Sequence, residues 1–208
     1  DSFIAGPETS PRGGGRASSV TISQSSSWRF RLKLSKKPAS RMALSDKFDP
    51  EARWMHQAID QAKRGIGLTS PNPPVGAVIV AQDRVIGQGY HAKAGGPHAE
   101  VEAIKDAKAH FPKLLPGSTI YVTLEPCCTH GRTPPCTDAI IAAGIKRVVI
   151  GANDPNPSHH QKARDLLMLA GVSVRSGLLA DECGELIRAF SKWITTGMPY
   201  VIAKSGQS

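Results

Sequence analysis

The sequence lacks long apolar segments and has few aromatic residues. Its longest unbroken apolar runs, at 75–81 and 139–145, contain seven residues each, whereas a helix that crosses a bilayer needs roughly 20. A transmembrane protein is therefore excluded, and no membrane partner is expected. Aromatic side chains make up only 5% of the 208 residues. No repeat with a period of about 20 to 50 residues is visible, which argues against a solenoid or a propeller.

Acidic residues are scarce, and most of the excess positive charge lies at one end of a chain whose net charge is +9. Residues 1–45 hold eight basic and two acidic residues, a net charge of +6. This leaves 18 basic and 15 acidic residues, a net charge of +3, for residues 46–208. A net charge this close to zero in residues 46–208 is not typical of proteins that neutralise many phosphates, so we expect no nucleic-acid partner. It suits one small anionic ligand.

Residues 1–45 have the composition of an unfolded leader. They contain eleven serines and three consecutive glycines, without an apolar periodicity that could offset the entropy of ordering. The Ser- and Arg-rich, acid-poor balance resembles an organellar transit peptide, and the alternative is an extension without a function. We expect a cytoplasmic protein, with a plastid location as the alternative if this leader is a transit peptide.

From residue 46 onwards the apolar periodicity alternates between strand and helix. We predict a helix that begins at 49–51 and ends before Gly65, and a hairpin of 75–80 and 84–90. The remaining predicted helices are 99–109, 137–143, 158–170 and 179–196, and the remaining predicted strands are 119–124, 146–150, 172–175 and 200–203. A hairpin followed by alternating helices and strands predicts a mixed sheet with helices on both faces.

The few cysteines point to metal binding rather than to disulfides. The chain has four, and no secretion signal accompanies them. Cys183 stands alone in the last predicted helix, where a small buried apolar residue is expected. Cys127, Cys128 and Cys136 lie between a predicted strand and a predicted helix, and the beginning of a helix favours thiolates.

His98 and Glu100 open another predicted helix and complete a zinc-site pattern with the cysteines. Zn²⁺ prefers thiolate and imidazole ligands, and three protein ligands leave a fourth position for water. A glutamate two residues from the histidine can shuttle protons without binding the metal. His-x-Glu followed by Pro-Cys is typical of zinc deaminases, although here eight residues separate Cys127 from Cys136.

Two alternatives to a catalytic zinc site remain open. One is a closed structural site with four protein ligands, in which Cys128 or His130 supplies the fourth. Successive residues of an extended backbone point in opposite directions, which disfavours Cys127 and Cys128 on one ion. The other alternative is a set of ordinary buried thiols with a surface histidine.

Several motifs together resemble the pyrimidine deaminase domain of the bifunctional riboflavin-biosynthesis deaminase/reductase family. They are residues 69–76 (TSPNPPVG), 89–91 (GYH), 95–100 (GGPHAE), 122–127 (VTLEPC), 131–136 (GRTPPC) and 154–157 (DPNP). The resemblance covers roughly residues 50–204 and implies a three-layer α/β/α, cytidine-deaminase-like fold with a mixed central sheet. It implies a zinc-dependent hydrolase that removes an amino group from 2,5-diamino-6-ribosylamino-4(3H)-pyrimidinone 5′-phosphate. The products would be 5-amino-6-ribosylaminouracil 5′-phosphate and ammonia.

The resemblance also assigns roles to individual residues by motif position. Three zinc ligands (His98, Cys127 and Cys136), one proton shuttle (Glu100) and three substrate contacts (Asn72, His91 and Arg132) are implied. Asn72 and His91 would line the base and ribose pocket, and Arg132 would face the 5′-phosphate. The chemistry agrees, because Asn72 lies in a proline-stiffened turn and Arg132 offers a planar fork for phosphate oxygens. The alternatives are a turn cap, a structural histidine and a solvated charge.

Domains and partners follow from the same resemblance. Residues 46–197 would form the deaminase domain, and residues 198–208 would be the start of a reductase domain or a C-terminal tail. We expect a phosphorylated pyrimidine nucleotide as the small-molecule partner, a homo-oligomer, and a separate reductase as a further candidate. Two other functions stay open: a related zinc deaminase that acts on another base or nucleotide, and a non-catalytic partner module of a separate reductase.

Overall fold

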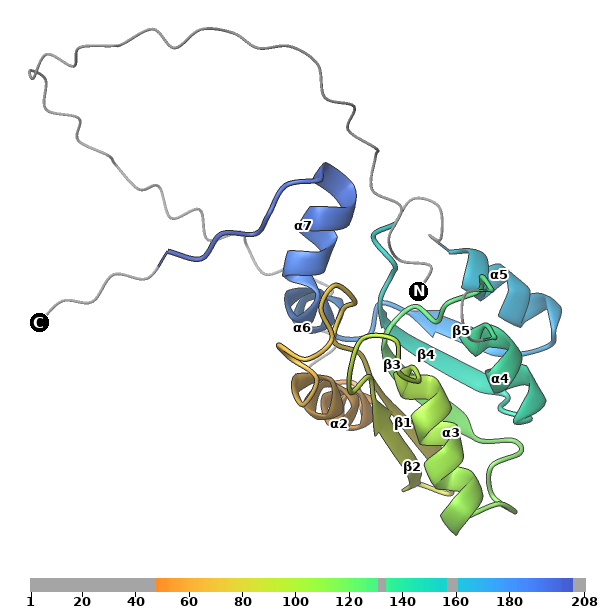
Figure 1. The fold of residues 1–208 in the computed structure, drawn as a ribbon. Helices are drawn as coiled ribbons and strands as arrows, with labels where there is room; N and C mark the ends of the chain where they lie inside the picture. The colour runs from red at the N-terminus through yellow and green to blue at the C-terminus, as the bar shows by residue number, and fades with distance from the viewer. Residues whose placement is uncertain (1–47, 131–133, 157–160, 204–208) are drawn as a thin grey trace, which may run out of the picture.

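The computed structural model describes residues 48–130, 134–156 and 161–203, so the predicted leader at 1–45 lies outside it. In this part of the chain, one helix and a hairpin come first, and helices and strands then alternate (Figure 1). The helices are α2 (Ala52–Lys63), α3 (Ala99–His110), α4 (Cys136–Ala142), α5 (Lys162–Leu169), α6 (Ala180–Leu186) and α7 (Arg188–Thr196). The strands are β1 (Gly76–Ala81), β2 (Arg84–Tyr90), β3 (Thr119–Leu124), β4 (Arg147–Ala152) and β5 (Ser173–Ser176).

The five strands form one mixed sheet in the order β2-β1-β3-β4-β5. β1 runs antiparallel to both β2 and β3, whereas β3, β4 and β5 are parallel to one another. Gln82 and Asp83 join β1 to β2 with φ angles of 51° and 58°, the left-handed pair that matches the twist of a two-residue hairpin. The predicted mixed sheet is confirmed.

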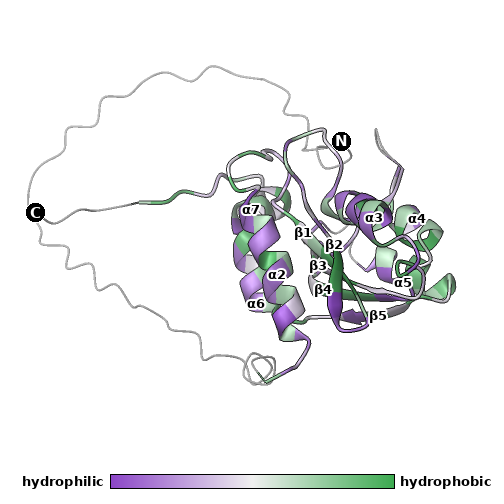
Figure 2. Ribbon diagram, turned by 90° about the horizontal axis from the view of Figure 1, so that it is seen from below, coloured by the Kyte–Doolittle hydropathy of each residue, from purple (hydrophilic) through white to green (hydrophobic). Residues whose placement is uncertain are grey.

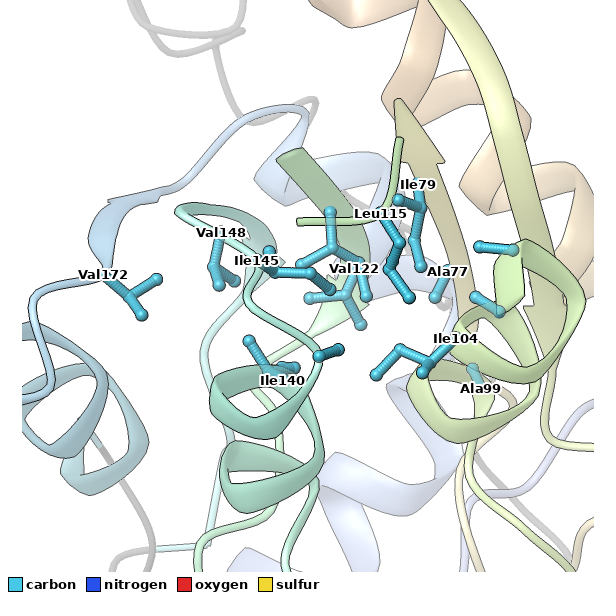
Figure 3. Close-up of a cluster of buried hydrophobic side chains, with 14 of the residues drawn as sticks. Ala77, Ile79, Ala99, Ile104, Leu115, Val122, Ile140, Ile145, Val148 and Val172 are labelled. Atoms are coloured by element: carbon cyan, nitrogen blue, oxygen red, sulfur yellow. The ribbon is translucent and has the colours of Figure 1, made fainter. Parts of the chain in front are cut away.

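Helices cover both faces of the sheet, so the fold has three layers. α2 and α6 lie on one face, and α3, α4 and α5 lie on the other (Figures 1 and 2). Side chains alternate along a strand, and both sets are apolar in the central strands. In β1, Ala77 and Ile79 join the core under α3 and α4 (Figure 3), while Val78 and Val80 join the core under α2. The predicted α/β/α architecture is therefore confirmed.

Two glycines of β2 allow α3 to lie directly on the sheet. A Cβ atom at Gly87 would approach the carbonyl oxygen of Ala103 to 2.4 Å, and one at Gly89 would approach the nitrogen of Ala103 to 2.5 Å. Neither distance is possible for real atoms, so a side chain at either position would displace the helix. This close contact fixes the position of the first turn of α3, which begins after His98.

The C-terminal part of the fold differs from the prediction. The single helix expected over 179–196 is two helices, α6 and α7, which meet at Ile187 (φ −103°, ψ 10°). Gly184 is a poor helix former, and Ile187 is buried where the helix breaks. The strand expected over 200–203 is not formed, because Val201 and Ile202 lie exposed without a neighbouring strand to bind them.

The first helix also begins slightly later than predicted. Asp49 accepts a hydrogen bond of 2.8 Å from the backbone N–H of Glu51, and the helix itself starts at Ala52. Among the described residues, every helix is too short or too polar to cross a bilayer.

Candidate metal centre and active site

Three chain segments meet where β3 ends. Cys127 follows β3 by three residues, His98 directly precedes α3, and Cys136 is the first residue of α4. α3 and α4 pack against each other on the same face of the sheet, which brings their first turns together. Residues that are far apart in the sequence thus converge beyond the carboxyl end of a strand, where open α/β sheets usually bind ligands.

His98, Cys127 and Cys136 could hold a metal ion, because one nitrogen and two sulfur atoms converge. Their ligand atoms all lie within 4.8 Å of one another. The Nδ1 atom of His98 is 3.5 Å from the Sγ atom of Cys127 and 3.3 Å from that of Cys136. Both cysteines are buried, and two thiolates with one imidazole form a donor set that suits zinc.

The structure also bears on the two candidates for a fourth protein ligand. Within the described ranges, the group that could hold a metal contains neither Cys128 nor His130. Cys128 is half-buried beside it and His130 is exposed. Three protein ligands leave a coordination position open, as catalytic zinc sites require and structural sites do not.

The electrostatics of the group favour a bound cation. Hydrogen bonds from Cys136 and His98 lower the pKa of the Cys127 thiol to about 4, which makes it a thiolate at neutral pH. The same thiolate raises the pKa of Cys136. Glu100 is 3% exposed, and burial raises the pKa of its carboxyl group to about 7. A positive ion between the two sulfur atoms would stabilise the thiolate form of both cysteines.

A small pocket adjoins the metal-binding group. Its lining residues come from the 72–75 turn, the end of β2, the start of α3 and the end of β3: Asn72, Pro73, Val75, His91, His98, Glu100, Leu124, Glu125 and Cys127. Asn72, His91 and Glu100 thus line one pocket with the metal-binding residues His98 and Cys127. Arg132 lies outside the described residues.

Asn72 and His91 are bonded to each other in a defined orientation. The Nδ1 atom of His91 lies 2.9 Å from the carbonyl oxygen of Pro97, which can only accept, so this nitrogen carries the proton. The Nε2 atom then accepts from the Asn72 amide at 3.3 Å. Burial lowers the pKa of His91 and favours the neutral ring that this pairing needs. The Asn72 amide oxygen and its second N–H remain available to a ligand.

Glu125 is a pocket residue to which sequence reasoning gave no role. It is 5% exposed, and its Oε2 atom accepts hydrogen bonds of 3.2 Å from the backbone N–H groups of Asp154 and Gln161. Its Oε1 atom is buried and has no hydrogen-bond partner among the described residues. The available signal was its place two residues before Cys127, in the same motif as the zinc ligand.

Comparison with known proteins identifies the family. Residues 49–152 match the family model described as the cytidine and deoxycytidylate deaminase zinc-binding region, which contains the whole metal-binding group. The chain belongs to this deaminase family. Zinc is therefore the cofactor for which His98, Cys127 and Cys136 form the candidate ligands.

Relatives are 44% to 50% identical to this chain over the aligned residues. The riboflavin biosynthesis protein RibD of Actinobacillus pleuropneumoniae is 50% identical over 73% of this chain and 39% of its own length. The chloroplastic riboflavin biosynthesis protein PYRD of Zea mays is 44% identical over 74% and 38%, respectively. The diaminohydroxyphosphoribosylamino-pyrimidine deaminase of Buchnera aphidicola is 44% identical over 70% of this chain and 97% of its own length.

Solved structures agree with these relatives. The diaminohydroxyphosphoribosylaminopyrimidine deaminase/5-amino-6-(5-phosphoribosylamino)uracil reductase of Thermotoga maritima superposes with a TM-score of 0.69 and 46% identity. The match covers 72% of this chain and 42% of the other. The chain thus spans about two fifths of the length of the RibD proteins and nearly the full length of the Buchnera deaminase.

Proposed function

We propose that this protein hydrolyses the amino group of 2,5-diamino-6-ribosylamino-4(3H)-pyrimidinone 5′-phosphate in riboflavin biosynthesis. Water supplies the oxygen of the new carbonyl group, the exocyclic C–N bond breaks, and ammonia leaves. The observation that carries the proposal is the open three-ligand group beside a pocket that contains Asn72, His91 and Glu100. The Buchnera relative, which the chain matches over 97% of its length, bears the name of this activity.

His98, Cys127 and Cys136 would hold the zinc ion of this reaction. When bound, zinc supplies a water molecule whose pKa is low enough for it to act as a nucleophile near neutral pH. Cys127 is held for this task by the backbone N–H of Cys136, which donates to its sulfur at 3.3 Å. The first turn of α4 thereby fixes the distance between the two sulfur ligands.

Glu100 would move the protons of the reaction. It lies two residues after His98 in the first turn of α3 and faces the same pocket. Hydrolysis needs one group that accepts a proton from the attacking water and returns it to the ring and the departing amine. Glu100 is buried and outside the ligand group, so its carboxyl group is the candidate for both transfers.

Asn72 and His91 would orient the base. His91 holds the amide of Asn72 in one orientation through the hydrogen bond between them. The amide oxygen of Asn72 and its second N–H group can then pair with a heterocycle. In this arrangement His91 positions Asn72, whereas the sequence alone predicted that both contact the substrate. Arg132 remains the candidate for the 5′-phosphate, because it is carried by the loop between the two cysteine ligands.

Partners and compartment follow as further parts of this proposal. The product of the deamination would pass to a reductase, because the Thermotoga relative is named for both activities, and a homo-oligomer is our expectation for the assembly. The maize relative is named chloroplastic, which keeps the plastid beside the cytoplasm as a candidate location.

Product identification tests the function. The zinc-loaded protein should convert the diaminopyrimidine nucleotide into a product that mass spectrometry identifies as the uracil derivative, with equimolar ammonia. Glu100→Gln should lower kcat by about 100- to 10,000-fold with one zinc per chain retained. Glu102→Gln, on the same helix turn, is the matched control and should keep activity. Conversion of cytidine, deoxycytidylate or guanine instead would show another deaminase, and inactivity on all substrates would support the non-catalytic alternative.

A further inference from the structure

Glu125 combines a tethered and an unsatisfied oxygen in the wall of the active-site pocket. Its side chain leaves the end of β3 and lines the pocket together with Asn72 and Glu100. The Oε2 atom receives two backbone N–H groups, from Asp154 and Gln161. These donors follow β4, so the carboxylate ties the segment after β4 to the end of β3.

The Oε1 atom of the same carboxylate has no hydrogen-bond partner within residues 48–130, 134–156 and 161–203. In the part of the chain that the structure describes, every other buried side-chain oxygen or nitrogen has a hydrogen-bond partner. An unsatisfied buried acceptor is costly, so native structures rarely contain one without a reason. Because the other oxygen is tethered on two sides, the carboxylate cannot rotate to find a partner without losing those bonds.

We propose that Glu125 is a substrate-binding residue whose Oε1 atom accepts a hydrogen bond from an N–H group of the bound base. This inference rests on the proposed function. The aminopyrimidine carries N–H groups besides the amino group that leaves, on the ring, at position 5 and on the ribosyl nitrogen. An oxygen acceptor in the pocket that Asn72 also lines favours a base edge that presents N–H donors, whereas a carbonyl edge would bring two acceptor oxygens together.

The substitution Glu125→Gln separates binding from structure. The Gln carbonyl oxygen can keep both backbone hydrogen bonds, and its NH₂ group then replaces the free acceptor with a donor. The zinc-loaded variant should melt within a few degrees of the unchanged protein and keep one zinc per chain. Its kcat/KM for the diaminopyrimidine nucleotide should fall about 10- to 150-fold, the value expected for a lost hydrogen bond to a charged group.

Calorimetric binding of the uracil product gives a readout without turnover. The product keeps N–H donors, so its Kd should rise by at least about 10-fold in Glu125→Gln. The control is Ser118→Ala, which removes a buried hydrogen bond to the carbonyl of Leu115 near the other end of β3 and should leave Kd unchanged.

Each outcome of the Glu125→Gln experiments supports or overturns the proposal. A Glu125→Gln variant with normal kcat/KM and normal product affinity overturns the proposal. So does a variant that loses zinc or melts far below the unchanged protein, because the carboxylate then serves only to tie two segments together. If the unchanged protein does not deaminate the nucleotide, the proposed function itself fails, which the same assay shows before any variant is compared.

Discussion

The carboxylate of Glu51 should make the stability of the fold depend on acid. It precedes α2 and accepts hydrogen bonds from Tyr121, Arg147 and Arg175, and Arg175 also binds Asp49. The hydrogen bonds from Arg147 lower the pKa of Glu51 from 4.5 to about 2. This change corresponds to about 3.4 kcal/mol, which solvent at the 22% exposed side chain reduces to about 1 to 2 kcal/mol.

The sign follows from the direction of the shift. Glu51 stays ionised at lower pH in the folded state than in the unfolded state. Its contribution to the free energy of unfolding is therefore complete above about pH 4.5 and disappears as the pH falls towards 2. Glu51→Gln should therefore lower the free energy of unfolding by about 1 to 2 kcal/mol at pH 7. The difference between the two proteins should shrink steadily below pH 4.5.

Urea unfolding followed by circular dichroism measures this difference, and zinc loss in acid affects both proteins alike. Asp83→Asn is the matched control, because Asp83 pairs with Arg53 where both side chains are more than half exposed. Such pairs contribute about 0 to 1 kcal/mol. A difference for Glu51→Gln that stays constant from pH 7 to pH 3, or that equals the control, would refute the reasoning.

Three further predictions concern the metal, the phosphate and the packing. Cys136→Ala should lose zinc, measured by elemental analysis. Cys183→Ala should keep zinc, because Cys183 is buried in the core on the α2 face of the sheet. Arg132→Ala should lower kcat/KM by about 10- to 150-fold for the nucleotide but barely for the nucleoside. Equal losses on both substrates would indicate that Arg132 stabilises its loop and does not bind the phosphate. Gly89→Ala should destabilise the fold by about 1 to 3 kcal/mol in urea, because the new Cβ atom meets the backbone of α3.

The sequence predicted the architecture well because periodicity is a local signal. Both strands of the hairpin and the strand over 119–124 have the predicted bounds within one residue, since each combines β-branched residues with flanking turn residues. The break at Ile187 was missed, because the helical apolar pattern continues through it and Gly184, which weakens the helix nearby, does not by itself mark a helix end. The strand over 200–203 was wrong because apolar composition cannot supply a pairing partner.

The candidate site was predictable in part for the same reason. The zinc ligand motifs stand in short segments, and their residue types alone indicate zinc. The convergence of His98 with Cys127, 29 residues apart, depends on how α3 lies on the sheet. The pairing of Asn72 with His91 and the free oxygen of Glu125 are equally properties of the folded chain. No local pattern indicates which of two carboxylate oxygens is left without a partner.

Stability and chemistry are concentrated at different ends of the sheet. Glu51 binds Arg147, the first residue of β4, whereas the metal-binding group follows the last residue of β3. The charged network ties the residues before α2 to the sheet through hydrogen bonds from Tyr121, Arg147 and Arg175 to Glu51. At the other end, one coordination position and one carboxylate oxygen lack partners among the described residues, and a bound water molecule and substrate can supply both. A substitution in the charged network should thus change unfolding without moving the ligands, and a substitution in the pocket should change turnover with little effect on unfolding.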